Sequence, residues 1–170
     1  VNNMRTPLIK KAEEWIDKTY SNSDHLIRTG YWIKQLYPKA DDALIIAAVT
    51  HDVERVFPKG RKPPSPELKG VKWSDSIYNR WHGKRSAEFV TNFLEINNAP
   101  KDVINNVAKL IIYHEEGGWK EADYLRDADS ISFLEINVPM FISRIPNKLR
   151  KVEVKEKFDY MFNRIGSKKA

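Results

Sequence analysis

The chain has 170 residues, 41% of them hydrophobic and 31% charged, which predicts one globular domain with a single core. It contains no cysteine, so a disulfide framework and thiolate metal sites are excluded. The sequence has no apolar run long enough to cross a membrane and no signal-peptide pattern. We therefore expect a cytoplasmic protein without a membrane partner.

Helical spacing of apolar residues dominates the chain, and no segment alternates as a half-buried strand does. Thr6 and Pro7 suit the N-cap and the first position of an opening helix. Ser23 or Asp24 is expected to cap a second helix, and Asp41 to precede a third. Further helices are predicted at about 76–96, 100–114 and 121–138, followed by an amphipathic helix that carries Phe158, Met161, Phe162 and Ile165. The predicted fold class is all-α.

Residues 57–73 are the exception, because four prolines and two glycines there exclude a continuous helix. A loop of this length in a compact domain is usually a lid, a binding loop or a disordered insertion. Basic residues outnumber acidic ones within it: Lys59, Arg61, Lys62, Lys69 and Lys72 face only Glu67. We interpret this Pro/Lys-rich loop either as an anion-attracting flap or as a solvated insertion.

The net charge of +6 raises the question of a nucleic-acid partner. The basic residues are spread along the chain, however, and no nucleic-acid motif is present. We expect a small anionic substrate instead, and the sequence leaves a homo-oligomer open.

The most apolar helical stretch, Ala43–Arg55, contains an adjacent histidine and aspartate near its end. Leu44, Ala47 and His51 recur at i, i+3 and i+7, which places the histidine on the core-facing stripe. A buried imidazole beside a carboxylate needs a partner, either a hydrogen-bond network or a metal ion. For His51 and Asp52 alone, both explanations are open.

The other three histidines and one aspartate also lie on the apolar stripes of separate predicted helices. The residues that converge on one interior are His25, His51, Asp52, His82, His114 and Asp129. A single buried histidine is more often an ordinary core residue than a ligand, but six such groups together favour a metal site. Imidazole and carboxylate without thiolate suit Mn, Fe, Co, Ni, Zn or Mg, and not a structural zinc site.

The order of these residues resembles the motif of the HD-domain superfamily of metal-dependent phosphohydrolases. The matching elements are Asp24-His25 in an early helix, His51-Asp52 at the end of an Ala-rich helix, and Asp127-Ala128-Asp129 late in the chain. His82 and His114 look like the two extra histidines of members that can hold a second metal. The resemblance covers about 24–136, and it implies one HD helical bundle over 1–170 with C-terminal helices over 137–170.

The resemblance implies four ligands of a first divalent ion, which are His25, His51, Asp52 and Asp129. Asp52 would bridge this ion to a second one held with His82 and His114. With only one ion, these two histidines would contact the phosphate. Asp52 and Glu54 are the expected catalytic residues, with Glu54 as a proton acceptor.

Two positions depart from the family pattern. Several family hydrolases carry a glutamate four residues after the motif histidine, where this chain has Arg55 and where Glu54 comes one position early. Some two-metal members have a histidine directly after the one matching His114, where this chain has Glu115. Both departures concern the mechanism and not the ligands of the first ion.

Three arginines follow three of the histidines by about one helical turn: Arg28, Arg55 and Arg85. This spacing places a guanidinium near the histidine's face of the helix, where it can bind phosphate in a forked geometry. The alternative is a solvent-exposed arginine at a helix end.

Paired divalent ions roughly 3.5–4 Å apart are a recurring arrangement for phosphoester hydrolysis. We therefore expect a hydrolase that cleaves a phosphomonoester or phosphoanhydride of a nucleotide-like metabolite by attack of a metal-bound water. The alternatives are a di-iron oxygenase of the same superfamily and a non-catalytic HD module that senses a ligand. The basic loop favours hydrolysis, and the complete ligand set disfavours the sensing module.

Overall fold

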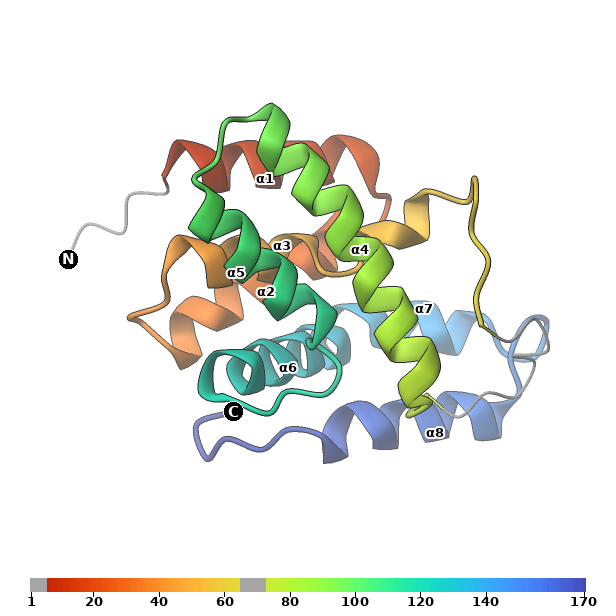
Figure 1. The fold of residues 1–170 in the computed structure, drawn as a ribbon. Coiled ribbons are helices and arrows are strands. Elements are labelled where there is room, and N and C mark those ends of the chain that lie inside the picture. The colour runs from red at the N-terminus through yellow and green to blue at the C-terminus, as the bar shows by residue number, and fades with distance from the viewer. Residues whose placement is uncertain (1–5, 65–72) are drawn as a thin grey trace.

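The computed structural model describes residues 6–64 and 73–170, and every regular element in these ranges is helical (Figure 1). The predicted all-α class is confirmed. The elements in chain order are α1 (Pro7–Thr19), α2 (Ser23–Leu36), α3 (Asp42–Thr50), the 3₁₀ helix η1 (Val53–Val56), α4 (Ser76–Ile96), α5 (Lys101–Ile112), α6 (Lys120–Ser132), the π-helical turn η2 (Phe133–Asn137), α7 (Val138–Ser143) and α8 (Lys151–Asn163).

The starts of α1, α3 and α4 follow capping residues that the sequence offers. Thr6 caps α1, and Asp41 caps α3 by accepting the backbone N–H of Leu44 at 2.9 Å. The start of α2 differs from the prediction, because Asn22 is the N-cap and its side chain makes no capping hydrogen bond. The predicted cap residue Ser23 instead donates to Asp17 at 3.1 Å, so its hydroxyl serves a different contact.

The helix expected over 121–138 is interrupted. α6 ends at Ser132, a π-helical turn covers Phe133–Asn137, and α7 continues from Val138 to Ser143. Pro139 has no backbone N–H to donate to the preceding turn, so a regular α-helical ladder cannot pass this point. The wider turn leads the chain away from the main bundle toward α8.

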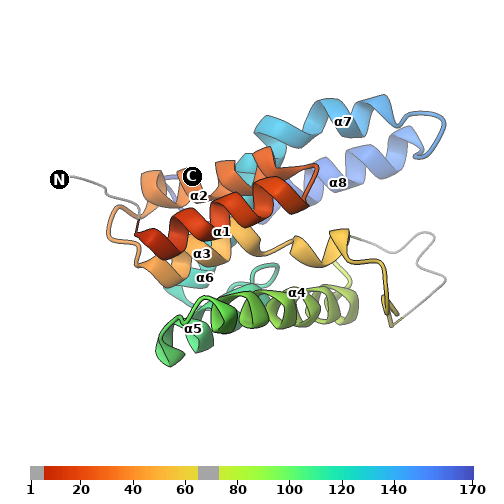
Figure 2. The ribbon, with the colours of Figure 1, turned by 90° about the horizontal axis from the view of Figure 1, so that it is seen from above.

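α3 lies at the centre of the main core, with α1, α2, α5 and α6 around it (Figures 1 and 2). All its residues from Ala43 to Thr50 are buried. A helix that is apolar on every side has no solvent face. The single core-facing stripe expected for this helix was therefore too narrow a description, and His51 follows a segment enclosed on all sides.

A second, smaller apolar cluster forms between η2, α7 and α8. Its buried members are Phe133, Phe141, Val154 and Met161. α7 and α8 run alongside each other at one edge of the molecule (Figure 2). The amphipathic prediction for α8 was wrong for Phe162, which is 66% exposed. It follows Met161 directly and so points about 100° away around the helix.

The described part of the Pro/Lys-rich loop is attached to the bundle at its first turn. Arg85 donates to the carbonyl oxygens of Phe57 at 2.8 Å and Lys59 at 2.9 Å. The Phe57 ring also stacks on Phe89, with centroids 4.2 Å apart. Glu67, Lys69 and Lys72 lie outside the described residues, so the flap stays a prediction.

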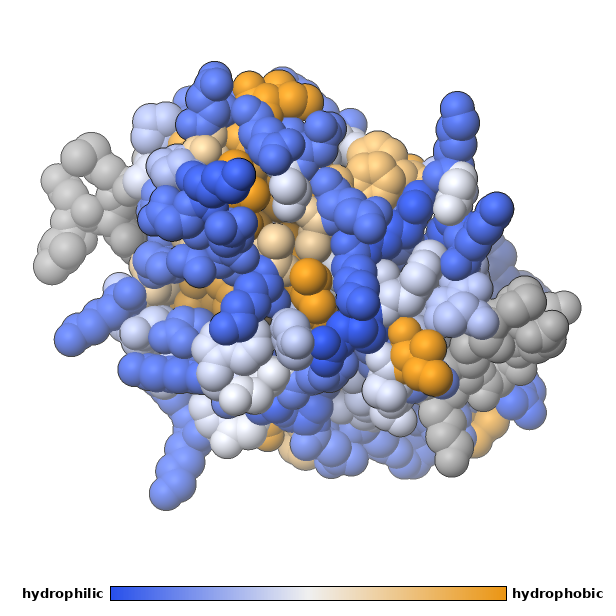
Figure 3. All heavy atoms as spheres, in the orientation of Figure 1, coloured by the Kyte–Doolittle hydropathy of each residue, from blue (hydrophilic) through white to orange (hydrophobic). Residues whose placement is uncertain are grey.

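The face drawn in Figure 3 is covered mainly by hydrophilic side chains, with hydrophobic ones in small separate groups. Within 6–64 and 73–170, no helix has the length and apolar character needed to span a membrane. The cytoplasmic location stays a prediction.

We expect Gly83→Ala to destabilise the bundle where α4 meets α5. A Cβ at Gly83 would lie 2.7 Å from the carbonyl oxygen of Ile112 and 2.9 Å from that of Ile111. Such overpacking costs about 1–3 kcal/mol, and the better helix propensity of alanine offsets about 1 kcal/mol of it. The atoms that the Cβ meets belong to the backbone of α5 and cannot easily move aside, so the upper part of this range applies, about 2–3 kcal/mol. Chemical denaturation should therefore show a free energy of unfolding lower by about 1–2 kcal/mol. Glu88→Ala, on an exposed position of α4, is the control, and equal stability of the two variants would contradict the close approach.

Candidate metal centre

The six predicted ligand residues come together in the interior, but three of them lie just past helix ends: His51 and Asp52 after α3, and His114 after α5. His25, His82 and Asp129 are within α2, α4 and α6. His51 is the C-cap of α3, and His114 lies two residues beyond the end of α5, where the sequence placed it inside the helix. All four imidazoles and the Asp129 side chain are buried. At both helix ends the chain turns, and the imidazole faces the neighbouring helices.

The ligand atoms form two groups that share Asp52. One group consists of His25, His51 and Asp52, and the other of Asp52, His82 and His114; the ligand atoms of each group lie within 4.8 Å of one another. Nitrogen and oxygen donors at this spacing could hold a metal ion. The sequence thus correctly placed these five residues near each other, while their role as ligands stays a prediction.

The imidazoles of His51 and His114 are each fixed by the backbone three residues earlier. His51 Nδ1 donates to the carbonyl oxygen of Ala48 at 2.9 Å, and His114 Nδ1 donates to that of Ile111 at 2.6 Å. A carbonyl oxygen can only accept, so Nδ1 carries the hydrogen in both rings. In the neutral ring, Nε2 then presents a lone pair, which is the form that binds a metal.

The other two rings are fixed by side chains. His25 Nδ1 lies 3.0 Å from Ser132 Oγ, whose hydroxyl donates to the His25 carbonyl oxygen at 2.7 Å. Because that hydroxyl hydrogen is used, Nδ1 is the donor in the first contact. His82 Nδ1 donates to the Glu54 carboxylate at 2.9 Å. All four rings therefore have an Nδ1 partner and turn Nε2 toward the centre.

Asp129 and Asp52 face these four Nε2 atoms. Asp129 Oδ1 lies 3.1 Å from His25 Nε2 and 3.3 Å from His51 Nε2. Asp52 Oδ1 lies 2.7 Å from His82 Nε2 and 3.8 Å from His114 Nε2. Each carboxylate thus serves one pair of histidines, which divides the cluster into two halves.

Two of the Nε2 atoms make no hydrogen bond. Those of His51 and His114 are fully buried, and no described residue is aligned to bond with either. An unpaired buried nitrogen is costly, and a functional site or an ion is a recognised explanation for one. A divalent cation bound at Nε2 would remove this cost, so the residues present fit a metal.

The second oxygens of the two aspartates are bound by arginines. Asp52 Oδ2 accepts from Arg55 Nε at 2.9 Å, and Asp129 Oδ2 accepts from Arg164. Asp52 was expected to bridge two ions with its two oxygens. In this arrangement such a bridge requires Arg55 to share Oδ2.

The surroundings set the protonation of the cluster. Burial disfavours the charged carboxylates, but Arg55 beside Asp52 and Arg164 beside Asp129 outweigh it and hold both pKa values well below the usual range. Burial lowers the pKa of His114 to about 4, with the nearby positive charge of His51 acting in the same direction. His114 is therefore neutral at physiological pH and its Nε2 is available to an ion.

His51 behaves differently. Burial opposes its charged form, but Asp129 and Asp52 outweigh that cost and raise the pKa of His51 to about 9. Since a metal ligand has to be the neutral imidazole, an ion bound at this half must displace the proton that the raised pKa keeps on His51.

Glu54 lies behind the imidazole of His82. It is fully buried and accepts from His82 Nδ1 and from Arg61 Nε, the latter at 3.2 Å. The ring of His82 separates it from Asp52, which contacts the opposite nitrogen. This geometry favours a positioning role for Glu54 through His82 and not the direct proton transfer that the sequence suggested.

The three predicted phosphate-binding arginines have different surroundings. Arg55 lines the central cleft, as described below. Arg28 Nε donates to Glu135 at 2.7 Å, and its guanidinium lies over Tyr31, outside the cleft. Arg85 binds the start of the Pro/Lys-rich loop. Of the three arginines, only Arg55 lines the cleft and could contact a substrate bound at the cluster.

Sequence reasoning missed the contribution of the C-terminal helix. Arg164 contacts Asp129 and Glu115, and it donates to Ser130 Oγ at 2.7 Å. Lys157, Met161 and Arg164 recur at i, i+4 and i+7, so two basic residues share the apolar stripe of α8. That stripe was the available signal, although it did not reveal which carboxylates Arg164 would meet.

A cleft of about 1210 Å³ opens beside the cluster. His25, Asp52, Arg55 and Asp129 line its inner end, and η2, the α7–α8 connection and α8 contribute the outer part. Half of the candidate ligands are thus accessible from this cleft, whereas His51, His82 and His114 are fully buried behind it.

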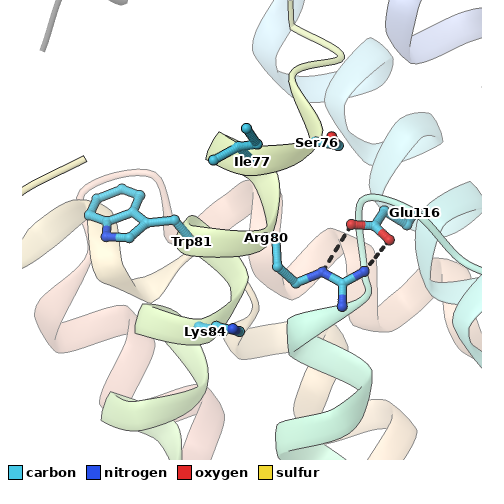
Figure 4. A pocket seen from close by; sticks show the side chains of 6 residues that line it. All are labelled: Ser76, Ile77, Arg80, Trp81, Lys84 and Glu116. Carbon is cyan, nitrogen blue, oxygen red and sulfur yellow. Dashed lines mark hydrogen bonds and ion pairs between the residues drawn. The ribbon is translucent and has the colours of Figure 1, made fainter. Parts of the chain in front are cut away.

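A second, shallower hollow of about 610 Å³ lies on the outer face of α4 (Figure 4). Arg80 and Glu116 form an ion pair across one side of it, and Ile77, Trp81 and Lys84 extend from the same helix (Figure 4). None of the six candidate ligands lines this hollow. This hollow is therefore separate from the candidate metal cluster.

Comparisons of the chain with models of known protein families, with curated protein sequences and with solved structures give no match. The resemblance to the HD superfamily therefore rests on the identity, order and positions of the candidate ligand residues.

Metal content should depend on Asp52 more than on any single histidine, because Asp52 belongs to both groups. If two ions bind, Asp52→Asn should lower the content from about two ions per chain to nearly none. His25→Gln and His82→Gln should each remove about one, because each belongs to a single group.

The measurement is elemental analysis after chelation and reconstitution with Mn²⁺ or Fe²⁺. Asp24→Asn is the control, because Asp24 is exposed and immediately precedes His25. A wild-type protein that retains no metal after reconstitution would exclude the proposed centre.

Proposed function

We propose that the protein is an HD-type phosphohydrolase that uses one or two divalent ions to cleave a phosphomonoester or phosphoanhydride. The observation that carries the proposal is the pair of buried, unpaired Nε2 atoms on His51 and His114, one in each group around Asp52. Ordinary core histidines are hydrogen-bonded, and in these two the Nδ1 contact turns Nε2 toward a carboxylate. The order His25, His51-Asp52, Asp129 supports the same family.

A divalent cation at such a site lowers the pKa of a bound water and offsets charge on phosphoryl oxygens. The protein's part is to hold the ligands in place. His25, His51, Asp52 and Asp129 would hold the first ion. Their Nδ1 partners and arginine contacts keep these side chains from rotating away.

The charge balance of the cluster suits an anionic substrate. Each of its carboxylates already has a basic partner: Arg55 for Asp52, Arg164 for Asp129 and Glu115, and Arg61 for Glu54. The charge of a bound cation would therefore be only partly neutralised by the protein. A phosphoryl group supplies the missing negative charge, and the excess positive potential draws it into the cleft.

Arg55 is the residue best placed to orient such a group. Its Nε is bound to Asp52, and this is the single hydrogen bond that its side chain makes among the described residues. The remaining guanidinium hydrogens are free to bind phosphoryl oxygens in a forked geometry, and the side chain is 39% exposed to the cleft.

The oxygenase alternative would use the same histidine and carboxylate cage. The cations along the cleft favour hydrolysis, because an oxygenase has no general need for them. A non-catalytic sensing module has no need for the two groups of ligands around Asp52. Both alternatives are distinguished by the reaction products.

The expected activity is metal-dependent phosphate release that Asp129→Asn abolishes. The amide is neutral and a poorer ligand, so kcat/KM should fall at least about a hundredfold while the fold is retained. Wild type and variant are compared on nucleoside phosphates and simple phosphoesters, with Mn²⁺, Co²⁺, Mg²⁺ or Fe²⁺ supplied in turn. Asp102→Asn, at an exposed position of α5, is the control.

Phosphate release that survives chelation or the Asp129 substitution would reject the mechanism. Oxygen consumption without phosphate release would identify the oxygenase instead.

A further inference from the structure

Lys157 is a cation in the cleft without a carboxylate partner. It lies on α8, and its side chain lines the cleft together with Arg55. Within the described residues no carboxylate oxygen lies within ion-pair distance of Nζ, and Nζ makes no hydrogen bond. By contrast, Arg55, Arg61 and Arg164 are each bound to a carboxylate.

The Lys157 ammonium is surrounded by aromatic rings instead. Nζ lies 5.1 Å from the centroids of Trp73 and Phe133 and 5.2 Å from that of Tyr160. Contacts with ring faces stabilise a cation but accept none of its hydrogens in the way an oxygen does. Burial lowers the pKa of Lys157 to about 8, against the opposing effect of Glu115, so it remains mostly charged at neutral pH.

Two of these rings place Lys157 next to both halves of the metal cluster. Phe133 meets the ring of His25 edge to face, with centroids 6.5 Å apart. Tyr160 donates to Glu115 Oε2 at 3.0 Å, and Glu115 Oε1 lies 3.8 Å from His114 Nε2. The ring of Phe133 therefore separates the ammonium from His25, and the ring of Tyr160 together with Glu115 separates it from His114.

The cleft thus has one cation at its inner end, Arg55, and another, Lys157, that the ring of Phe133 separates from the candidate ligand His25. A substrate with a single phosphoryl group can satisfy the first but leaves the hydrogens of the second without an acceptor. An unpaired ammonium in a partly buried position favours a ligand that supplies an oxygen anion there.

We infer that Lys157 binds a second anionic group of the substrate, a phosphate or a carboxylate, adjacent to the phosphoryl group held at the metal cluster. The substrate class is a compound with two neighbouring anionic groups, such as a diphosphate or a phosphorylated acid. The rings around Lys157 exclude water from this second contact and strengthen it. The inference rests on the proposed function, because it assumes that the first group is bound at the cluster.

The test compares binding of three non-hydrolysable probes to the Mn²⁺-loaded protein by isothermal titration calorimetry. Methylenediphosphonate carries two phosphonate groups, phosphonoacetate carries one phosphonate and one carboxylate, and methylphosphonate carries a single group. Lys157→Met keeps the length and apolar stem of the side chain but removes its charge. Lys155→Met is the control, because Lys155 lies on the same helix, is highly exposed and pairs with Asp159.

We expect Lys157→Met to weaken binding of at least one two-group probe by about tenfold or more, as for a lost charge-assisted hydrogen bond. Its affinity for methylphosphonate should change by less than about threefold, and Lys155→Met should change neither affinity by more than this. The two-group probe that loses affinity identifies the second group as phosphate or carboxylate. Thermal unfolding of both variants at the wild-type temperature excludes a folding defect as the cause.

Unchanged affinity for both two-group probes, or an equal loss for all three probes, would overturn the inference. A wild-type protein that binds none of the probes would overturn it together with the proposed function. Selective loss of a two-group probe in a protein that releases no phosphate from any ester would support the anion site and reject the hydrolase.

Discussion

The candidate metal centre depends on one constraint: a contact at Nδ1 fixes the orientation of each of its four imidazole rings. Two rings bind backbone carbonyls, one binds a hydroxyl and one binds a carboxylate. Without these contacts, rotation about the side-chain torsions could turn any Nε2 away from the centre. With them, the four Nε2 atoms converge on two aspartates, and the polar cluster can lie inside an apolar bundle. The Nδ1 contacts thus both satisfy the buried imidazoles and set the direction of their Nε2 atoms.

Two parts of the fold, α3 and α8, position the side chains of the cluster from opposite sides. The buried α3 is followed by its C-cap His51, so Asp52 and the buried Glu54 come at a fixed point beside the core. From the opposite side, α8 returns over the cleft and brings Arg164 onto Asp129 and Glu115. The C-terminal helix is therefore part of the cluster and not an appendage to it, and it also carries Lys157 and the apolar residues of the cleft wall.

The sequence was sufficient for the helical class, for most helix starts and for the proximity of the six ligand-type residues. These features follow from local signals: helical spacing of apolar residues, N-cap residues such as Thr6 and Asp41, and polar groups on apolar stripes. It was not sufficient for contacts between distant elements. The pairing of Glu54 with His82, of Arg28 with Glu135 and of Arg164 with Asp129 depends on how helices are placed in space. The residue types alone did not distinguish a catalytic glutamate from one that orients a histidine.

The most direct test of this account is the tautomeric state of the four histidines, measured by ¹⁵N NMR of the imidazole nitrogens during titration with diamagnetic Zn²⁺. The account predicts that every Nδ1 stays protonated, that every Nε2 is unprotonated in the loaded protein, and that the Nε2 resonances of His51 and His114 shift on binding. Imidazole spectra that do not respond to Zn²⁺, or rings that keep the hydrogen on Nε2, would contradict it.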